Sequence, residues 1–203
     1  LHGANLEADY LLFIEGKDAK TFLQGQVTCN VNDLTTNNSL LGCHCNAKGR
    51  VIFDFRAGLY ADDKVALRVK GPMLNQAKTS LGKYIVFSKA KITHPEQPYR
   101  IYGFFGITAG ELMSHVKEEI YEHAKLVEIH EQLLEVWVAP EYQSQFESMV
   151  SSLPFTSEAD WMIERMKSGI AELSPDLVEQ YVPQDIDLDE AGAINFKKGC
   201  YTG

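Results

Sequence analysis

Three closely spaced apolar runs in the first half of the chain are the feature that most constrains its fold. They cover residues 40–45, 51–60 and 65–69 and are joined by Asn-Ala-Lys-Gly at 46–49 and Ala-Asp-Asp-Lys at 61–64. Runs of this length, bounded by turn-forming residues, are typical of β-strands. The sequence therefore predicts a strand meander at the centre of the first domain.

A helix is predicted on each side of this meander. A short helix is predicted over 17–23, where Ala19, Phe22 and Leu23 recur at helical intervals. Pro72 suits a helix start because its φ is fixed and it lacks an N–H, so a helix is predicted over 73–85 and a strand over 89–93. The polar segment 30–39 is predicted to be a loop with at most one helical turn.

Pro95 and Pro98 mark a boundary, after which strands and helices alternate. We predict strands over 100–107, 126–130 and 134–138, and helices over 111–124 and 140–153, the first of them burying Leu112, Val116 and Ile120. This order predicts a small α/β sandwich with helices on one sheet face, inserted as residues 98–154. Residues 1–97 and 155–203 would form the other domain, which makes the fold class α+β.

The chain is expected to return to the first domain after residue 154. A helix is predicted over 157–168, with Ser157 as its N-cap and Gly169 at its end. Residues 175–203 show little periodicity, so we expect a loop-rich segment that wraps back on the first domain.

Charge and cysteine content narrow the functional classes. The net charge of -9 argues against direct nucleic-acid binding, because a protein that grips phosphates usually presents a basic face. Four cysteines in 203 residues are too few for a disulfide framework and favour a reducing, cytoplasmic compartment. Apolar runs such as 10–14 and 101–107 are too short to span a bilayer, so no membrane partner is expected.

The segment 195–203, Asn-Phe-Lys-Lys-Gly-Cys-Tyr-Thr-Gly, carries the clearest chemical signal. Nearby cations lower the pKa of a thiol and favour its reactive thiolate form, and Lys197 and Lys198 precede Cys200. Gly199 and Gly203 allow sharp turns or a close approach of the backbone. The sequence predicts a thiol presented on a constrained loop; the alternative is a buried small side chain beside two solvated lysines.

Four segments, in order along the chain, resemble the YgfZ-type folate-binding, tRNA-modifying protein family, which is related to the aminomethyltransferase T protein. They are Phe-Leu-Gln-Gly-Gln-Val-Thr at 22–28, His-Cys-Asn-Ala-Lys-Gly-Arg at 44–50, Lys-Tyr-Ile-Val-Phe-Ser-Lys at 83–89 and Lys-Lys-Gly-Cys-Tyr-Thr-Gly at 197–203. The resemblance implies a folate-binding aminomethyltransferase-like fold with the strand-helix insertion. In the family a C-terminal barrel follows, and the chain is expected to lack it.

The resemblance also implies a function and a site. It implies binding of tetrahydrofolate or a related folate, and a role in assembling or repairing iron–sulfur enzymes such as those that methylthiolate tRNA. This makes the tRNA link indirect and the protein an accessory factor more than an enzyme. The residues expected to act are Cys200 and Lys198 as the reactive pair, and Trp161, Arg165, Gly199 and Tyr201 around the folate. Trp161 and Arg165 would share one helix face, although Trp161 also suits a structural core.

Two other functions stay open. A folate-dependent one-carbon transferase would use Asp54, but Phe53 replaces the second acidic residue found in true aminomethyltransferases. A non-catalytic interaction module would use the 197–203 loop for docking. No metal site is predicted: Cys43-His44-Cys45 places both thiols on one side of a strand but has no second ligand pair.

Overall fold

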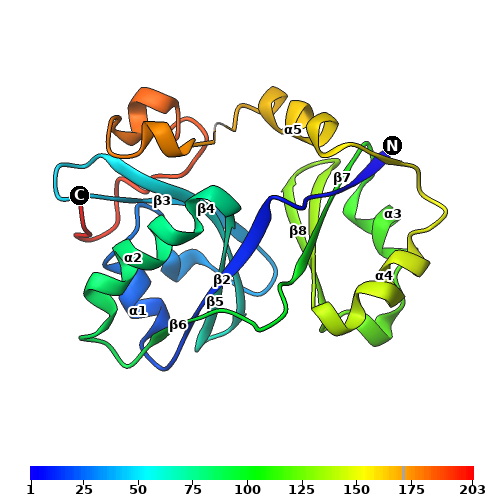
Figure 1. Cartoon of the computed structure of the whole chain (residues 1–203), viewed down its shortest axis with the longest axis horizontal. Coiled ribbons are helices and arrows are strands. Elements are labelled where there is room, and N and C mark those ends of the chain that lie inside the picture. The colour runs from blue at the N-terminus through cyan, green and yellow to red at the C-terminus, as the bar shows by residue number, and fades with distance from the viewer. Residues whose placement is uncertain (171) are drawn as a thin grey trace. The chain divides into compact units, whose positions relative to one another are not determined.

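The computed structural model describes residues 1–170 and 172–203, which form two compact units (Figure 1). The first unit combines Leu1–Tyr10 with Pro95–Ser168, and the second combines Leu11–His94 with Gly169–Gly203. Each unit is built on a five-stranded sheet.

The sheet of the first unit has the strand order β10-β1-β7-β9-β8. Its strands are β1 (His2–Asn5), β7 (Arg100–Phe105), β8 (Ala124–His130), β9 (Leu133–Val138) and β10 (Phe155–Thr156). β1 and β10 are parallel, whereas β1–β7, β7–β9 and β9–β8 are antiparallel. The central strand β7 therefore carries residues that face both sides of the sheet.

Helices cover both faces of this sheet. The first unit contains α3 (Ala109–Met113), α4 (Gln143–Met149) and α5 (Glu158–Lys167), with 3₁₀ turns at Glu118–Ile120 and Pro140–Tyr142. Tyr102 and Phe104 pack in one core with Leu112 of α3 and Phe146 of α4. Gly103 lies between them in sequence and faces the opposite side, where α5 lies (Figure 1).

The helix predicted over 111–124 is wrong. α3 ends at Met113, a 3₁₀ turn follows, and β8 begins at Ala124, which pairs with Val138. Leu112, Val116 and Ile120 are all buried, as the helical spacing suggested, but the last two reach the core from turns. Strand pairing and core packing outweigh the helical periodicity here. The helix predicted over 140–153 is also shorter than expected, because α4 covers only Gln143–Met149.

The predicted insertion, 98–154, lies within the first unit, which also contains β1, β10 and α5. The helix predicted over 157–168 is confirmed as α5, and the Ser157 side chain accepts a hydrogen bond from the N–H of Asp160 as the N-cap. The division into domains 1–97 with 155–203, and 98–154, stays a prediction.

The second unit confirms the predicted meander. Its sheet has the order β3-β4-β5-β2-β6, formed by β2 (Asp9–Glu15), β3 (Ser39–Cys45), β4 (Val51–Ala61), β5 (Lys64–Lys70) and β6 (Lys91–Thr93). The pairs β3–β4 and β4–β5 are antiparallel. The predicted helices are present as α1 (Ala19–Gln24) and α2 (Leu74–Ile85), with 3₁₀ turns at Val31–Asp33 and Gly71–Met73.

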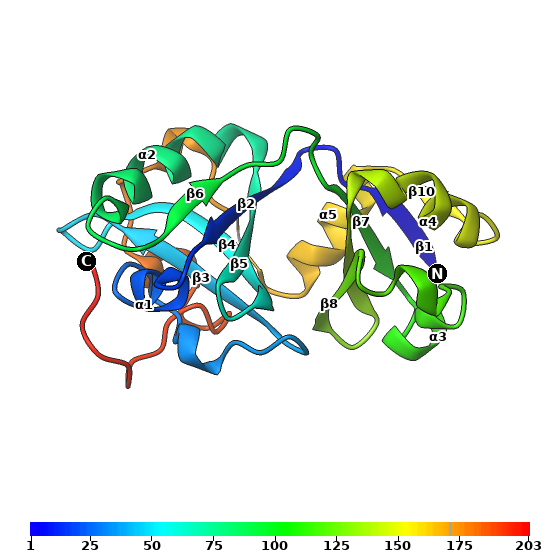
Figure 2. The same cartoon turned by 90° about the horizontal axis from the view of Figure 1, so that it is seen from below.

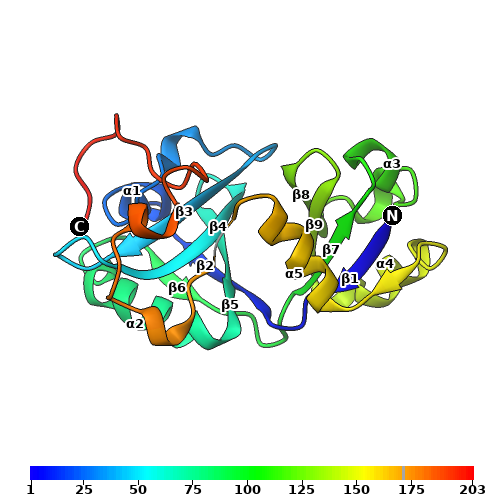
Figure 3. The ribbon, with the colours of Figure 1, turned by 90° about the horizontal axis from the view of Figure 1, so that it is seen from above.

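The C-terminal segment returns to this unit through loops, as predicted. After 3₁₀ turns at Pro175–Leu177 and Pro183–Ile186, it continues without helix or strand. The N–H of Val51 donates to the carbonyl of Tyr181 at 2.8 Å, and the N–H of Glu179 donates to the carbonyl of Val51 at 2.8 Å. Figures 2 and 3 show the C-terminus beside the tip of the β3–β4 hairpin.

Among the described residues, no helix has both the length and the apolar character needed to span a membrane.

Candidate functional site

All four segments that carry the family resemblance lie in the second unit, where the first (22–28) is in direct contact with the C-terminal part of the chain. The Thr28 hydroxyl donates to the carbonyl of Ala193 at 2.7 Å, and the N–H of Asn195 donates to the carbonyl of Thr28 at 2.9 Å. Farther along, the N–H of Thr202 donates to the carbonyl of Gly25 at 3.1 Å. The tail, residues 193–203, is therefore tied to the loop that follows α1.

Lys198 holds the centre of this tail. Its ammonium donates to the carbonyl oxygens of Gln24, Val27 and Cys29 at 2.9, 2.6 and 2.7 Å. An ammonium has three N–H donors, so these three carbonyls use all of them. The same nitrogen lies 4.9 Å from the centre of the Tyr201 ring, within cation–π range. Burial lowers the pKa of Lys198, and the Cys29 thiol opposes that shift.

The tail also closes a pocket of about 240 Å³ against the end of β3. Its lining includes Thr28, Cys45, Pro183, Phe196, Tyr201 and Gly203. Gly203 fits tightly: a Cβ added there would lie 2.8 Å from the Cβ of Cys45, and its φ is +118°. The volume lies below the roughly 300–1,000 Å³ typical of ligand sites, so the pocket suits a small molecule or one ring of a larger one.

His44, in the resembling segment 44–50, connects the segment 83–89 to the same region. Its Nδ1 lies 2.7 Å from the carbonyl oxygen of Gln26, and its ring contacts Tyr84 edge-on at 6.4 Å between centroids. Burial lowers the pKa of His44, with a further contribution from Lys83, while the bond to Gln26 opposes the shift. His44 is thus a buried imidazole that joins α2 to β3.

The structure brings four of the six sequence-predicted site residues together on the tail. Cys200 is an exposed free thiol, and Tyr201 is half-buried in the wall of the pocket. Gly199 has open space where a Cβ would be. Lys198 is tied to the three carbonyls, so its closest interactions are with the 24–29 loop. The reactive role predicted for the pair Cys200 and Lys198 stays a prediction.

The other two predicted residues, Trp161 and Arg165, lie on α5 in the first unit. Trp161 is fully buried, and its indole lies directly over Gly103: a Cβ at that glycine would be 2.5 Å from Trp161 Cδ2. The indole Nε1 has no hydrogen-bond partner within the part of the chain that the structure describes. Arg165 is also buried, one helical turn later. Trp161 thus has the packing of a core residue, and its role in folate binding stays a prediction.

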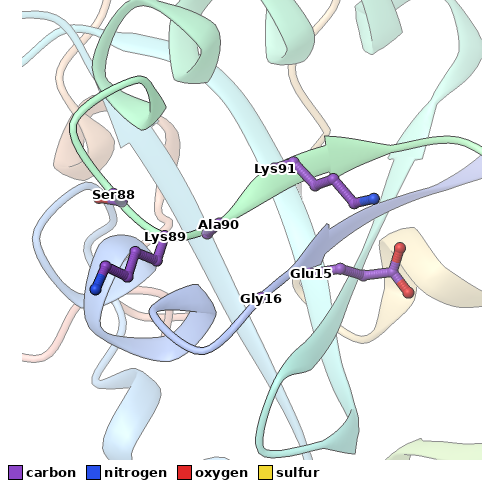
Figure 4. A pocket seen from close by; sticks show the side chains of 6 residues that line it. All are labelled: Glu15, Gly16, Ser88, Lys89, Ala90 and Lys91. Atoms are coloured by element: carbon purple, nitrogen blue, oxygen red, sulfur yellow. The ribbon is translucent and has the colours of Figure 1, made fainter.

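A second pocket, of about 500 Å³, lies beside the turn that follows β2 (Figure 4). It is lined by Glu15, Gly16, Ser88, Lys89, Ala90 and Lys91. Gly16 has φ +132°, and a Cβ there would lie 2.4 Å from the carbonyl oxygen of Lys89, so glycine is required for the close approach. Glu15 already accepts from the Thr93 hydroxyl and pairs with Lys64 at 3.5 Å. We interpret this pocket as a structural feature of the fold and propose no ligand for it.

Sequence reasoning missed two residues of the tail pocket, Thr28 and Cys45. Thr28 lies in the first resembling segment, but nothing in its spacing indicated that its hydroxyl would accept the N–H of Cys43 at 2.9 Å while donating to Ala193. Cys45 was considered only as a metal ligand. Among the described residues, no group of three or more His, Cys, Asp or Glu side chains could hold a metal ion.

Comparison with known proteins identifies relatives along nearly the whole chain. No family model matches. The chain is 29% identical to the tRNA-modifying protein YgfZ of Aliivibrio fischeri strain MJ11 over 198 residues, which cover 95% of this chain and 61% of that protein. It is 31% identical to the YgfZ protein of Escherichia coli strain SE11 over 206 residues, covering 95% and 62%. The chain thus spans about three fifths of the length of the curated relatives it matches.

The structure is similar to that of the glycine cleavage system aminomethyltransferase T from Bartonella henselae. The TM-score is 0.75 at 15% sequence identity, over 94% of this chain and 57% of that protein. This similarity confirms the predicted fold class.

Proposed function

This chain is a relative of the YgfZ-type tRNA-modifying proteins, and from that premise we propose that it is a folate-binding accessory factor that supports tRNA modification. It would do so by helping to assemble or repair iron–sulfur enzymes, among them enzymes that methylthiolate tRNA. The observation that carries the proposal is the tail loop, which is held by the three carbonyl contacts of Lys198 and leaves Cys200 exposed.

Cys200 is the proposed functional thiol. It lies two residues after Lys198, whose ammonium binds three carbonyls, and directly before Tyr201, which lines the pocket. These anchors on both sides limit the positions that the thiol can take, and preorganisation of this kind is what a nucleophile or a transfer group needs. Lys198 acts in this proposal as a positioning residue, because its ammonium fixes the loop.

The proposed ligand is tetrahydrofolate or a related folate. Support comes from the family resemblance and from a pocket beside Cys45 with two aromatic side chains, Phe196 and Tyr201. A flat ring can stack on such side chains. At about 240 Å³ the pocket would take one ring of a folate and leave the rest outside. Trp161 and Arg165 stay proposed folate contacts on the strength of the resemblance.

The net charge of -9 supports an indirect link to tRNA, through protein partners and without phosphate contacts. All four cysteines are free thiols, which supports a reducing compartment, and we propose the cytoplasm.

The test combines folate binding with rescue of a strain that lacks the protein. Tetrahydrofolate is titrated against the chain while tryptophan fluorescence is recorded, and the titration is repeated on Trp161→Phe and on Trp137→Phe, a matched change at the other buried tryptophan. The proposal expects saturable quenching that only Trp161→Phe weakens. It also expects Cys200→Ser to reduce tRNA methylthiolation in the rescued strain, while Cys29→Ser, at a buried thiol, rescues fully.

Other outcomes select the other functions. Formation of methylene-tetrahydrofolate from an aminomethyl donor, lost in Asp54→Asn, would establish a one-carbon transferase. The carboxylate of Asp54 accepts the N–H of Leu173 at 3.2 Å, so circular dichroism of that variant must first show a native fold. Absence of folate binding, with partner binding retained in Cys200→Ser, would establish an interaction module and refute the proposal.

A further inference from the structure

Cys43 and Cys45 form a pair of thiols that the proposed function does not use. They lie two residues apart on β3, so their side chains point to the same side of the strand. Their sulfur atoms are 4.0 Å apart, and both are free thiols in a buried environment. The strand register shifts between His44 and Cys45, where Cys45 pairs with Val51 while His44 pairs with Phe53. The two thiols therefore lie at an irregular point in the sheet.

Only one of the two thiols lines the tail pocket. Cys45 lines the tail pocket of about 240 Å³, whereas Cys43 is fully buried and is not part of the lining. Thr28, which also lines the pocket, holds Cys43 in place: its Oγ1 accepts the N–H of Cys43 at 2.9 Å and lies 3.4 Å from the Cys43 sulfur. A small molecule in the pocket would meet Cys45 first, with Cys43 directly behind it.

The two thiols also differ in acidity. The hydrogen bond from the Cys43 thiol lowers the pKa of Cys45, although burial opposes this shift. The same contact, together with burial, raises the pKa of Cys43. Cys43 has one S–H, and this donor forms a stronger hydrogen bond with a charged thiolate at Cys45 than with a neutral thiol. Cys45 is thus suited to attack as a thiolate and Cys43 to follow as the second thiol.

We propose that Cys45 is a site of oxidation by hydrogen peroxide or another small hydroperoxide, and that Cys43 resolves the product to an intrachain disulfide. The Cys45 thiolate attacks the outer oxygen of the hydroperoxide, the O–O bond breaks, and the leaving alkoxide or hydroxide takes up a proton. Cys45 becomes a sulfenic acid. The Cys43 sulfur then attacks the Cys45 sulfur and expels hydroxide, which leaves as water with the Cys43 proton. The two thiols lose two electrons, and the hydroperoxide gains them.

The second step requires the two sulfur atoms to move towards each other, and the strand that carries them to adjust. A disulfide has its sulfur atoms about 2.05 Å apart, so the two sulfurs must approach by roughly 2 Å from their present separation. Rotation of the two side chains can supply part of this movement, and the register shift beside Cys45 frees the strand from a regular ladder on that side. The volume of the pocket favours peroxides over a bulky peptide disulfide as the oxidant.

Cys29 provides an internal control within the same protein. Burial raises its pKa to about 11, and its sulfur lies under β3 at Gly42, outside the lining of the tail pocket. The contact with Cys43 lowers the pKa of Cys45, whereas burial raises that of Cys29, and only Cys45 lines the tail pocket. We therefore expect Cys45 to be oxidised faster than Cys29.

The experiment begins with Cys200→Ser, which removes the exposed thiol and leaves the pair unchanged. The protein is treated with hydrogen peroxide for increasing times, the remaining thiols are alkylated under denaturing conditions, and the proteolytic peptides are analysed by mass spectrometry. The proposal expects a peptide with Cys43 and Cys45 unalkylated and lighter by two hydrogen atoms, formed before Cys29 is lost. Reduction with dithiothreitol should restore both thiols.

Two variants identify the order of the steps. In Cys43→Ser, the sulfenic acid at Cys45 has no resolving thiol and should be trapped by dimedone. In Cys45→Ser, neither the adduct nor the disulfide should form. The proposal is overturned if Cys43 and Cys45 stay fully alkylatable in the Cys200→Ser protein, or if Cys29 is oxidised as fast as they are, and neither result requires the pair variants to fold. Dimedone labelling of Cys43 in place of Cys45 would overturn the assigned order.

Discussion

Replacing Gly103 with alanine should destabilise the first unit, because the new methyl group would collide with Trp161. A Cβ at this position would lie 2.5, 2.6 and 2.8 Å from Cδ2, Cε3 and Cε2 of the indole. Carbon atoms pack at about 3.5–4.0 Å, so the ring must retreat by roughly 1 Å. Overpacking of this kind costs about 1–3 kcal/mol. The lower backbone entropy of alanine in the unfolded chain offsets about 0.5–1 kcal/mol of this cost, so the net loss is at most about 2.5 kcal/mol.

The collision can be isolated with a double-mutant cycle. Trp161→Phe removes one ring of the indole, so adding Gly103→Ala should cost less in the Trp161→Phe protein than in the wild type. The expected coupling is about 1 kcal/mol or more, since the two residues are in direct contact. Gly110→Ala is the control: it lies on α3 with no atom within 4 Å of the added Cβ, and it should be neutral or stabilising by about 0.5–1 kcal/mol.

The assay is urea denaturation followed by far-UV circular dichroism, which does not depend on the tryptophan that is replaced. Gly103→Ala should lower the urea midpoint of the transition in which the first unit unfolds, with the slope unchanged. The reasoning would be refuted if Gly103→Ala were as stable as the wild type, or if the two substitutions were additive. Either result would mean that the Trp161 indole does not lie over Gly103.

Three further predictions concern the tail, a buried histidine and a helix cap. Lys198→Met leaves three carbonyls without their donor and should lower the stability of the second unit by about 2 kcal/mol, whereas Lys197→Met, at an exposed position, should change little in the same urea titration. Burial lowers the pKa of His44 below its ordinary 6.5, so the unfolded chain binds more protons than the folded one. Stability should therefore be constant above about pH 6.5 and fall below it, and His44→Gln should flatten that decline in urea midpoints measured from pH 5 to 8. Thr108→Ala breaks the capping box with Glu111 and should cost about 1 kcal/mol, a result contradicted by an unchanged midpoint.

The second unit was the more predictable of the two from sequence. Its strands are local meander pairs whose turns carry recognisable residues, such as the Asn46–Gly49 turn, in which Gly49 has φ +73°. Here local pattern and final structure agree. The sequence predicts that the tail returns to this unit but does not predict how it is attached. Lys198 binds three backbone carbonyls, and because every residue has a carbonyl, residue types do not identify which ones are bound.

The first unit departs from its sequence pattern where long-range pairing overrides it. Leu112, Val116 and Ile120 have helical spacing, and all three reach the core, yet only Leu112 lies in an α-helix. β8 must begin at Ala124 to pair with β9, so the chain turns earlier than an uninterrupted helix would allow. The strand β1 was not identified at all, because a four-residue strand offers too little alternation to detect.

In the candidate site, too, local features are predictable from sequence and long-range contacts are not. Cys200, Gly199 and Tyr201 were identified because they lie in one short segment with a recognisable composition. Thr28 and Cys45 belong to the same pocket but lie far from the tail in sequence, as the contact between Thr28 and Ala193 illustrates with its separation of 165. Only the folded chain shows that they are neighbours.

The attachment of the tail has a consequence for the order in which the protein is made. A ribosome releases the chain from the N-terminus, and the strand that carries Cys43 and Cys45 is complete long before residues 193–203 leave the exit tunnel. Throughout that interval, the carbonyls of Gln24, Val27 and Cys29 lack the ammonium that later binds them, and the pocket beside Cys45 has no outer wall. The nascent protein therefore passes through a stage in which the tail does not yet cover Cys45, and the time taken to translate residues 46–203 sets how long that stage lasts.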